Sequence, residues 1–129
     1  MYLALPERTE AIAREIVDAA YKIHTVLGPG LLESVYEKCF CYELSKRRIS
    51  YVRQRLVPIT YEDLIVDEGL RLDILVEDQI LIELKAQEQS HPVWEAQLLS
   101  YMKLTGKRIG FLINFHTPVM KKGIKRFIN

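Results

Sequence analysis

Three charged residues interrupt two apolar stretches within residues 70–87. Asp73 lies in the first stretch, and Glu83 and Lys85 lie in the second, separated only by Leu84. Two carboxylates that share one place can bind a hard divalent cation such as Mg²⁺, which prefers oxygen ligands and bridges to phosphate. A lysine beside them could orient a water molecule or stabilise developing negative charge. These residue types therefore indicate metal-assisted hydrolysis of a phosphate ester.

The apolar pattern predicts how the two stretches pair. Residues opposite each other in an antiparallel pair point to the same face, so pairing Val76 with Ile80 gives one wholly apolar face. Its members would be Leu72, Ile74, Val76, Ile80, Ile82 and Leu84. The same register places Asp73 opposite Glu83, with Lys85 on the same face. The alternative is a solvent-facing hairpin in which Lys85 and a neighbouring arginine bridge the two acids.

The remaining chain predicts the elements that position this hairpin. Helical spacing of apolar residues predicts helices over 7–27, 31–47 and 92–106. Runs of β-branched and aromatic residues predict strands over 49–63, 70–76, 80–87, 107–115 and 123–129. Gly28 is a candidate cap for the first helix, and Pro58 indicates a bulge or an end in the first strand. The order ααβββαβ(β) predicts a mixed α/β fold with helices packed on a central sheet.

Length and composition favour one soluble domain over residues 1–129. The chain has 129 residues, 49% of them hydrophobic and 27% charged. No apolar run approaches the roughly 20 residues needed to cross a bilayer, and the N-terminus lacks the pattern of a secretory signal. We therefore expect a cytoplasmic protein that does not associate with a membrane.

Basic residues gather in two segments, although the net charge is only +1. The residues that could contact phosphates are Lys46, Arg47, Arg48, Arg53, Arg55, Lys121, Lys122, Lys125 and Arg126. Such clusters can bind a nucleic-acid backbone locally without a high overall charge. On charge alone, two solvated faces are the simpler interpretation.

Three motifs together resemble the PD-(D/E)XK nuclease superfamily. The first is Asp73 followed by Glu83-Leu84-Lys85. The second is "QLLSY", from Gln97 to Tyr101, which resembles the Q-x-x-x-Y element of several branches. The third is "GLLESVY", residues 30–36, which resembles the signature of the GxxExxY family. The similarity extends over about residues 8–128, and it implies a restriction-endonuclease-like core.

The resemblance implies a role for each matching residue. The metal ligands would be Glu33, Asp73, Glu83 and the backbone carbonyl of Leu84. The catalytic set would be Asp73, Glu83, Lys85, Gln97 and Tyr101. Leu72 stands where many superfamily members have proline, a position that varies among them. From the residues alone, Glu33 could equally be an acid favoured by the dipole at a helix N-terminus.

The resulting hypothesis is a Mg²⁺-dependent nuclease, with Mn²⁺ as a substitute, that acts on nucleic acid and in particular on DNA. A homodimer is a further expectation, because small members of the superfamily often dimerise. The alternative is a non-catalytic nucleic-acid-binding or adaptor module that retains the fold. Loss of metal-dependent cleavage in Asp73→Ala would distinguish the two.

Overall fold

Helices and strands follow one another in the order that the sequence predicts, with one addition. The computed structural model describes residues 4–129, so residues 1–3 of the expected domain lie outside the described part. The elements are α1 (Glu7–Leu27), α2 (Glu33–Lys46), β1 (Tyr51–Tyr61), β2 (Leu64–Val76), β3 (Ile80–Lys85), α3 (Pro92–Thr105), β4 (Ile109–Asn114), α4 (Met120–Gly123) and β5 (Ile124–Ile128). The short helix α4 was not predicted. No helix among the described residues has the length and apolar character to cross a membrane.

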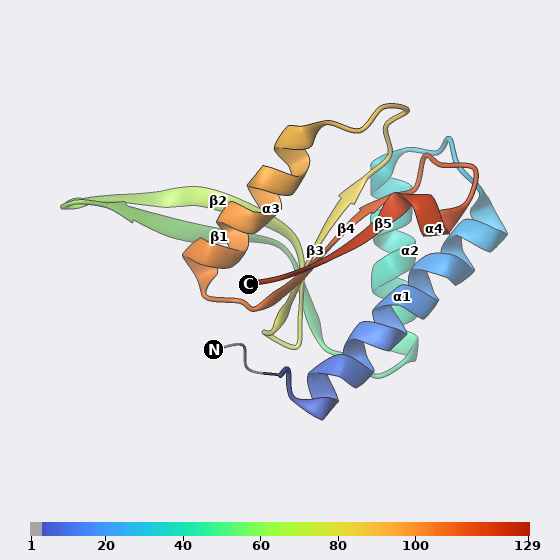
Figure 1. Ribbon diagram of the computed structural model, residues 1–129, viewed down its shortest axis with the longest axis horizontal. Helices are drawn as coiled ribbons and strands as arrows, with labels where there is room; N and C mark the ends of the chain where they lie inside the picture. Colours follow the sequence, from blue (N-terminus) through green and yellow to red (C-terminus); the bar gives the residue numbers. More distant parts are fainter. Residues whose placement is uncertain (1–3) are drawn as a thin grey trace.

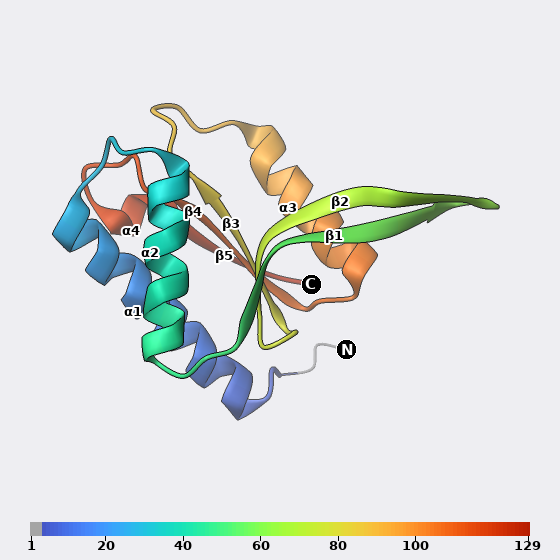
Figure 2. The ribbon, with the colours of Figure 1, turned by 180° about the vertical axis from the view of Figure 1, so that it is seen from behind.

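The strands form one mixed sheet in the order β1-β2-β3-β4-β5. Strands β3 and β4 pair in parallel, and the other neighbours are antiparallel. Helices α1 and α2 cover one face, and α3 covers the other (Figures 1 and 2). Two hydrophobic cores correspond to these layers, one against α1 and α2 and one against α3. The central strands β3 and β4 are buried from both sides, which confirms the α/β layer arrangement.

The predicted pairing of the central hairpin is confirmed. Val76 lies opposite Ile80, and Ile74 lies opposite Ile82. Ile74, Ile82 and Leu84 belong to the core under α1 and α2, as the apolar face predicts. Leu72 was also expected on that face, but this was wrong, because it packs in the core under α3.

A local distortion explains the position of Leu72. Gln54 and Asp73 lie between two paired positions of β1 and β2 but are not themselves paired. Gln54 has a φ of 51°, a left-handed conformation that interrupts the regular alternation of a strand. The sheet changes direction at Gln54 and Asp73, so Asp73 lies at the bend.

Beyond this point, β1 and β2 continue as a two-stranded ribbon that projects from the body (Figure 1). We call residues 55–72 the β1–β2 arm. The sequence predicted a strand only from residue 70, whereas β2 begins at Leu64. The register shifts between Val57 and Ile59, which confirms a bulge at Pro58. Gly69 is needed there, because a Cβ at this position would overlap the side chain of Ile59.

Candidate active site

Asp73 and Glu83 meet where the backbone pairing of β2 and β3 ends. The last paired residues are Ile74 and Ile82. Beyond them, hydrogen bonds to side chains take the place of backbone-to-backbone pairing. The Leu84 N–H donates to Asp73 Oδ2 at 2.8 Å, and the Asp73 N–H donates to Glu83 Oε1 at 3.3 Å. These hydrogen bonds fix both carboxylates beside the β3 backbone. The backbones of β2 and β3 are no longer paired at this point, and the two acids lie between them.

Burial makes this pair of carboxyl groups unusually weak acids. Glu83 is only 5% exposed, and burial raises its pKa to about 8, with the charge of Asp73 adding to the effect. Burial also raises the pKa of Asp73, although the hydrogen bond from Leu84 opposes it. Burying two like charges side by side is costly unless a cation compensates them. No cation of the described chain contacts either carboxyl group, so burial favours their protonated forms.

Lys85 is near the acids but does not neutralise them by direct contact. Its Nζ lies 5.3 Å from the centroid of the Trp94 ring, in a cation–π arrangement. Within residues 4–129, Lys85 forms no ion pair. The solvent-facing hairpin is thus contradicted at two points, because Glu83 is buried and Lys85 does not bridge the acids.

Glu33 enters the same charged neighbourhood from the first turn of α2. Partial burial raises its pKa, and the charge of Asp73 raises it further, whereas Lys85 lowers it. The residue as a whole is exposed. The charges of Asp73 and Lys85 thus reach Glu33, and its role as a metal ligand stays a prediction.

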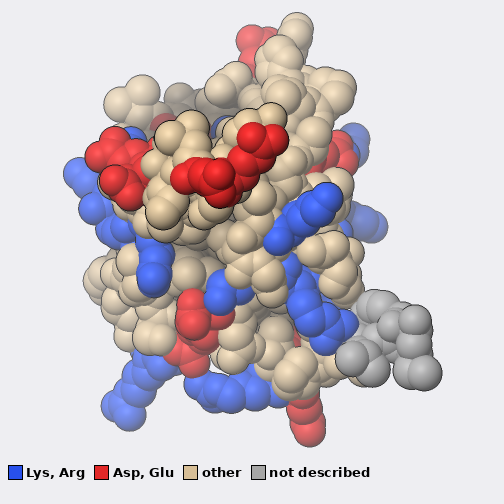
Figure 3. Space-filling view, turned by 90° about the vertical axis from the view of Figure 1, so that its left-hand side faces the viewer, with Lys and Arg blue, Asp and Glu red and all other residues tan. Residues whose placement is uncertain are grey.

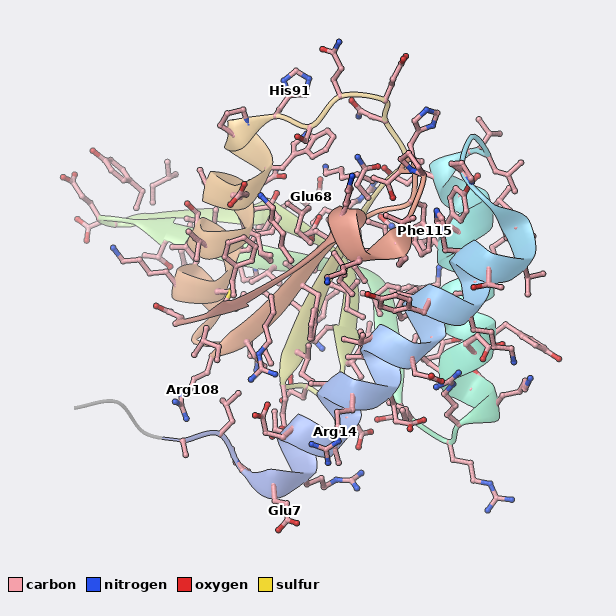
Figure 4. The ribbon with its side chains drawn as sticks, turned by 45° about the vertical axis from the view of Figure 1, so that its right-hand side comes forward. Glu7, Arg14, Glu68, His91, Arg108 and Phe115 are labelled. Atoms are coloured by element: carbon pink, nitrogen blue, oxygen red, sulfur yellow. The ribbon has the colours of Figure 1, made fainter. Side chains whose placement is uncertain are left out.

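The turn before α2 explains the other two positions of the G-x-x-E-x-x-Y motif. Gly30 has a φ of 99°, which strongly favours glycine. The hydroxyl of the buried Tyr36 donates to Gly28 O at 2.6 Å and accepts from the Leu31 N–H at 3.2 Å. The Tyr36 ring stacks on Phe115, which is labelled in Figure 4. The glycine and tyrosine therefore shape the turn from which α2 and its Glu33 begin.

Gln97 and Tyr101 border the site from α3. Gln97 Nε2 donates to the Tyr101 hydroxyl at 2.9 Å, as expected for residues one helical turn apart. Burial raises the pKa of Tyr101, and the charges of Glu83 and Asp73 raise it further. The Q-x-x-x-Y element therefore faces the carboxylates from the side of the sheet opposite to α2.

Glu37 is a buried acid that the sequence analysis did not identify. It is 7% exposed and accepts hydrogen bonds from Arg53 and Gln54. Its charge raises the pKa of Asp73. Its spacing of four residues from Glu33 was a usable signal, because both share one helix face.

Asn114 is a second residue that the sequence analysis missed. It lies opposite Lys85 in the parallel pair of β3 and β4. Its side chain accepts from the Gln87 N–H and donates to the Gln87 carbonyl. Asn114 therefore fixes the chain as it leaves β3 directly after Lys85.

The predicted phosphate-binding residues divide into paired and unpaired groups. Arg47 is only 16% exposed and contacts Glu15, Asp18 and Glu43, so its place is between α1 and α2. This corrects the expectation that Arg47 faces nucleic acid. Ion pairs also engage Lys46, Arg53, Lys125 and Arg126. Within the described chain, no ion pair engages Arg48, Arg55, Lys121 and Lys122.

A cleft opens beside Trp94, at the ends of β3 and β4. Its volume is about 140 Å³, and Lys122, His116 and Asn114 contribute to its walls. This is below the roughly 300–1,000 Å³ of pockets that enclose drug-sized ligands. The cleft is therefore large enough for only one small polar group. Glu88 and Glu95 also line it, whereas Lys85 does not.

The donor set suits a hard divalent cation. No three His, Cys, Asp or Glu side chains among residues 4–129 already form a metal-sized cluster. Mg²⁺ does not need such a cage, since it usually keeps several waters and takes one or two carboxylates from the protein. Asp73 and Glu83 are the two carboxyl groups that could supply such ligands. The Leu84 backbone N–H donates to Asp73, so the Leu84 carbonyl lies in the same part of β3. Glu33 forms no metal-sized cluster with these two acids within residues 4–129.

Comparison with known proteins gives one match. A family model described as the PD-(D/E)XK nuclease superfamily matches residues 10–127, nearly the whole chain. Searches of curated proteins and of solved structures give no match.

Proposed function

Because the chain belongs to the PD-(D/E)XK nuclease superfamily, we propose that it is a metal-dependent nuclease that hydrolyses phosphodiester bonds, with DNA as the favoured substrate. The observation that carries the proposal is the buried pair of Asp73 and Glu83, which no cation among the described residues contacts. We assign Mg²⁺ as the metal ion, with Mn²⁺ as a substitute, because all the candidate ligands are oxygen atoms. The turn around Gly30 and Tyr36 supports membership of the GxxExxY branch.

Asp73, Glu83 and the Leu84 carbonyl would hold the metal ion, with Glu33 as an additional ligand. When bound, the ion supplies Lewis acidity and lowers the pKa of coordinated water. Glu83 has a pKa of about 8 and is mostly protonated at neutral pH, so it must release this proton to act as a ligand.

Lys85 would orient the attacking water and stabilise charge that develops on the phosphate. Its cation–π contact with Trp94 would keep the ammonium group near the acids while it forms no ion pair with either of them. Gln97 and Tyr101 would bound the substrate from α3.

The nucleic-acid backbone would pass the site towards the cleft beside Trp94. Lys122 lines this cleft, and Lys121 is exposed next to it. Phosphate contacts from such lysines position a strand without reading its sequence. We therefore propose a nuclease that recognises backbone and shape more than a long base sequence.

Cleavage assays test this function. Purified protein is incubated with single- and double-stranded DNA and RNA in EDTA, Mg²⁺ or Mn²⁺, beside Asp73→Ala and Lys85→Ala. We expect metal-dependent products with wild type and loss of cleavage in both variants. Binding without cleavage of any substrate would instead identify a non-catalytic module. Cleavage that persists in both variants would reveal a contaminating nuclease and leave the proposed site without support.

A further inference from the structure

Glu37 is a buried acid of α2 that contacts two consecutive residues of β1. Acidic side chains on the face shown in Figure 3 project into solvent, whereas Glu37 is 7% exposed. Its Oε2 accepts two hydrogen bonds from the Arg53 guanidinium, at 2.7 and 3.2 Å, and its Oε1 accepts one from the side-chain amide of Gln54. A buried carboxylate is tolerated when donors of this kind compensate it. Glu37 therefore holds both residues on the α2 side of the sheet.

A regular strand could not place Arg53 and Gln54 on the same side, because successive side chains point to opposite faces. Gln54 has a φ of 51°, in the left-handed region, and this conformation allows its side chain to follow that of Arg53 towards α2. A residue other than glycine keeps such a φ where surrounding contacts hold it there. The hydrogen bond from Gln54 to Glu37 is such a contact.

The distortion at Gln54 coincides with a change on the neighbouring strand. Gln54 and Asp73 lie between two paired positions of β1 and β2 without pairing themselves. On one side of Asp73, Ile74 packs under α1 and α2; on the other side, Leu72 packs under α3. The alternation of β2 therefore breaks at Asp73, at the same step of the sheet where β1 is held by α2.

We propose that Glu37 and Gln54 are positioning residues that place the Asp73 carboxylate for the metal ion, an inference that rests on the proposed metal site. Glu37 keeps Gln54 left-handed, and Asp73 is thereby kept out of regular pairing with β1. Asp73 instead bonds β3, where its carboxylate accepts from the Leu84 N–H and its own N–H donates to Glu83. Residues that orient a metal ligand from outside typically change metal affinity about 10–100-fold when they are substituted.

Exchanging the two side chains tests the contact between them. Glu37→Gln sets an amide donor against the donors of Arg53 and Gln54, and Gln54→Glu sets two carboxylates against each other. In the double variant, the amide introduced at position 37 can donate to the carboxylate introduced at position 54, and its oxygen can accept from Arg53. The contact is then restored with donor and acceptor exchanged, so recovery in the double variant identifies this contact as the cause of the effect.

Titration with Mn²⁺ at pH 7 gives the first measurement. Each single variant should raise the dissociation constant at least about tenfold, and the double variant should recover most of the affinity. The single variants change the charge in opposite directions, so a purely electrostatic effect would weaken binding in one and strengthen it in the other. Glu43→Gln is the matched control, because Glu43 is a buried acid of α2 that pairs with Arg47. It should keep the wild-type affinity.

Amide hydrogen exchange in EDTA gives a second measurement that needs no metal ion. The Leu84 amide should exchange at least about tenfold faster in each single variant, because its bond to Asp73 is weakened. The Phe115 amide, which donates to the Lys85 carbonyl of β3, reports general loss of stability. The ratio of the two rates should therefore rise in both single variants, return towards wild type in the double variant and stay unchanged in Glu43→Gln.

The outcomes separate this inference from the proposed function. A wild type that binds no Mn²⁺ would contradict both. A wild type that binds Mn²⁺ beside single variants of equal affinity would overturn the inference alone, and so would an unchanged ratio of exchange rates. A double variant that recovers neither the affinity nor the ratio would also overturn it.

Discussion

At the scale of single residues, Glu83 links stability to pH. Its pKa lies at about 8 in the folded protein, against a reference value of 4.5. Between these values the unfolded chain has released a proton that the folded protein retains, so rising pH favours unfolding. One pKa unit corresponds to roughly 1.4 kcal/mol, and the total decrease in stability is on the order of a few kcal/mol. Denaturant unfolding in EDTA should show this decrease in wild type and a flatter profile in Glu83→Gln.

The control for this prediction is Glu88→Gln, which changes an exposed acid and should retain the wild-type profile. Adding Mg²⁺ at pH 8 should restore stability to the wild type, because binding to the folded state stabilises it by mass action. Equal pH profiles for wild type and Glu83→Gln would show that burial of this carboxyl group is not costly.

Lys85 carries a second prediction for a single residue. Lys85→Ala should reduce the cleavage rate at least about 100-fold, in line with the removal of other groups that stabilise transition-state charge. Binding of Mn²⁺ should persist, because Lys85 is not a ligand. Cleavage rates and metal titrations measure the two effects, with Lys103→Ala as the control. Unchanged cleavage in Lys85→Ala would remove the lysine from the mechanism.

At the scale of elements, the turn between α1 and α2 is expected to control Glu33. Tyr36→Phe removes the hydroxyl that bonds Gly28 and Leu31. Leaving those backbone groups unpaired should destabilise the fold by about 1–3 kcal/mol. It should also lower the cleavage rate, because the start of α2 is no longer anchored. The matched control is Tyr42→Phe, which changes a residue that is 65% exposed.

Thermal melts and cleavage rates of the two tyrosine variants provide the measurement. Tyr42→Phe should match the wild type in both. Equal stability of Tyr36→Phe and wild type would show that the hydroxyl does not hold the turn. A stable Tyr36→Phe with full activity would also separate this motif from the active site.

Local periodicity was enough to predict most elements and the register of the central hairpin. Helix α1 spans the predicted residues 7–27, because its apolar residues repeat at helical spacing and Gly28 ends it. The pairing of Val76 with Ile80 could be deduced because a shift of one residue would mix apolar and charged side chains on both faces of the hairpin. Asp73 and Glu83 were therefore predictable as neighbours from sequence alone.

Features that depend on distant residues could not be deduced in the same way. Leu72 changes face because Gln54, on another strand, adopts a left-handed conformation. Arg47 is removed from the basic surface by Glu15 and Asp18 of α1. The burial of Glu37 likewise depends on Arg53. Sequence patterns predict faces and registers, whereas these contacts require the complete fold.

At the scale of the whole molecule, the basic surface near α4 should contribute to affinity without contributing to sequence preference. Lys121→Ala with Lys122→Ala should weaken binding to all nucleic acids of equal length. The slope of log affinity against log salt should fall by about 0.9 for each phosphate of duplex DNA that the variant no longer neutralises. Fluorescence anisotropy at several salt concentrations measures this, with Lys38→Ala and Lys103→Ala as the control. An unchanged slope would exclude these lysines from the interface.

Titration with Mn²⁺ tests most directly whether the acids of the hairpin form a metal site. The protein is titrated calorimetrically at pH 7 in two buffers that differ in ionisation enthalpy. We predict saturable binding that releases close to one proton per ion, since Glu83 has a pKa of about 8 and must ionise to bind. Asp73→Asn should abolish most of this binding. Absence of saturable binding, or equal binding by wild type and Asp73→Asn, would contradict the central claim.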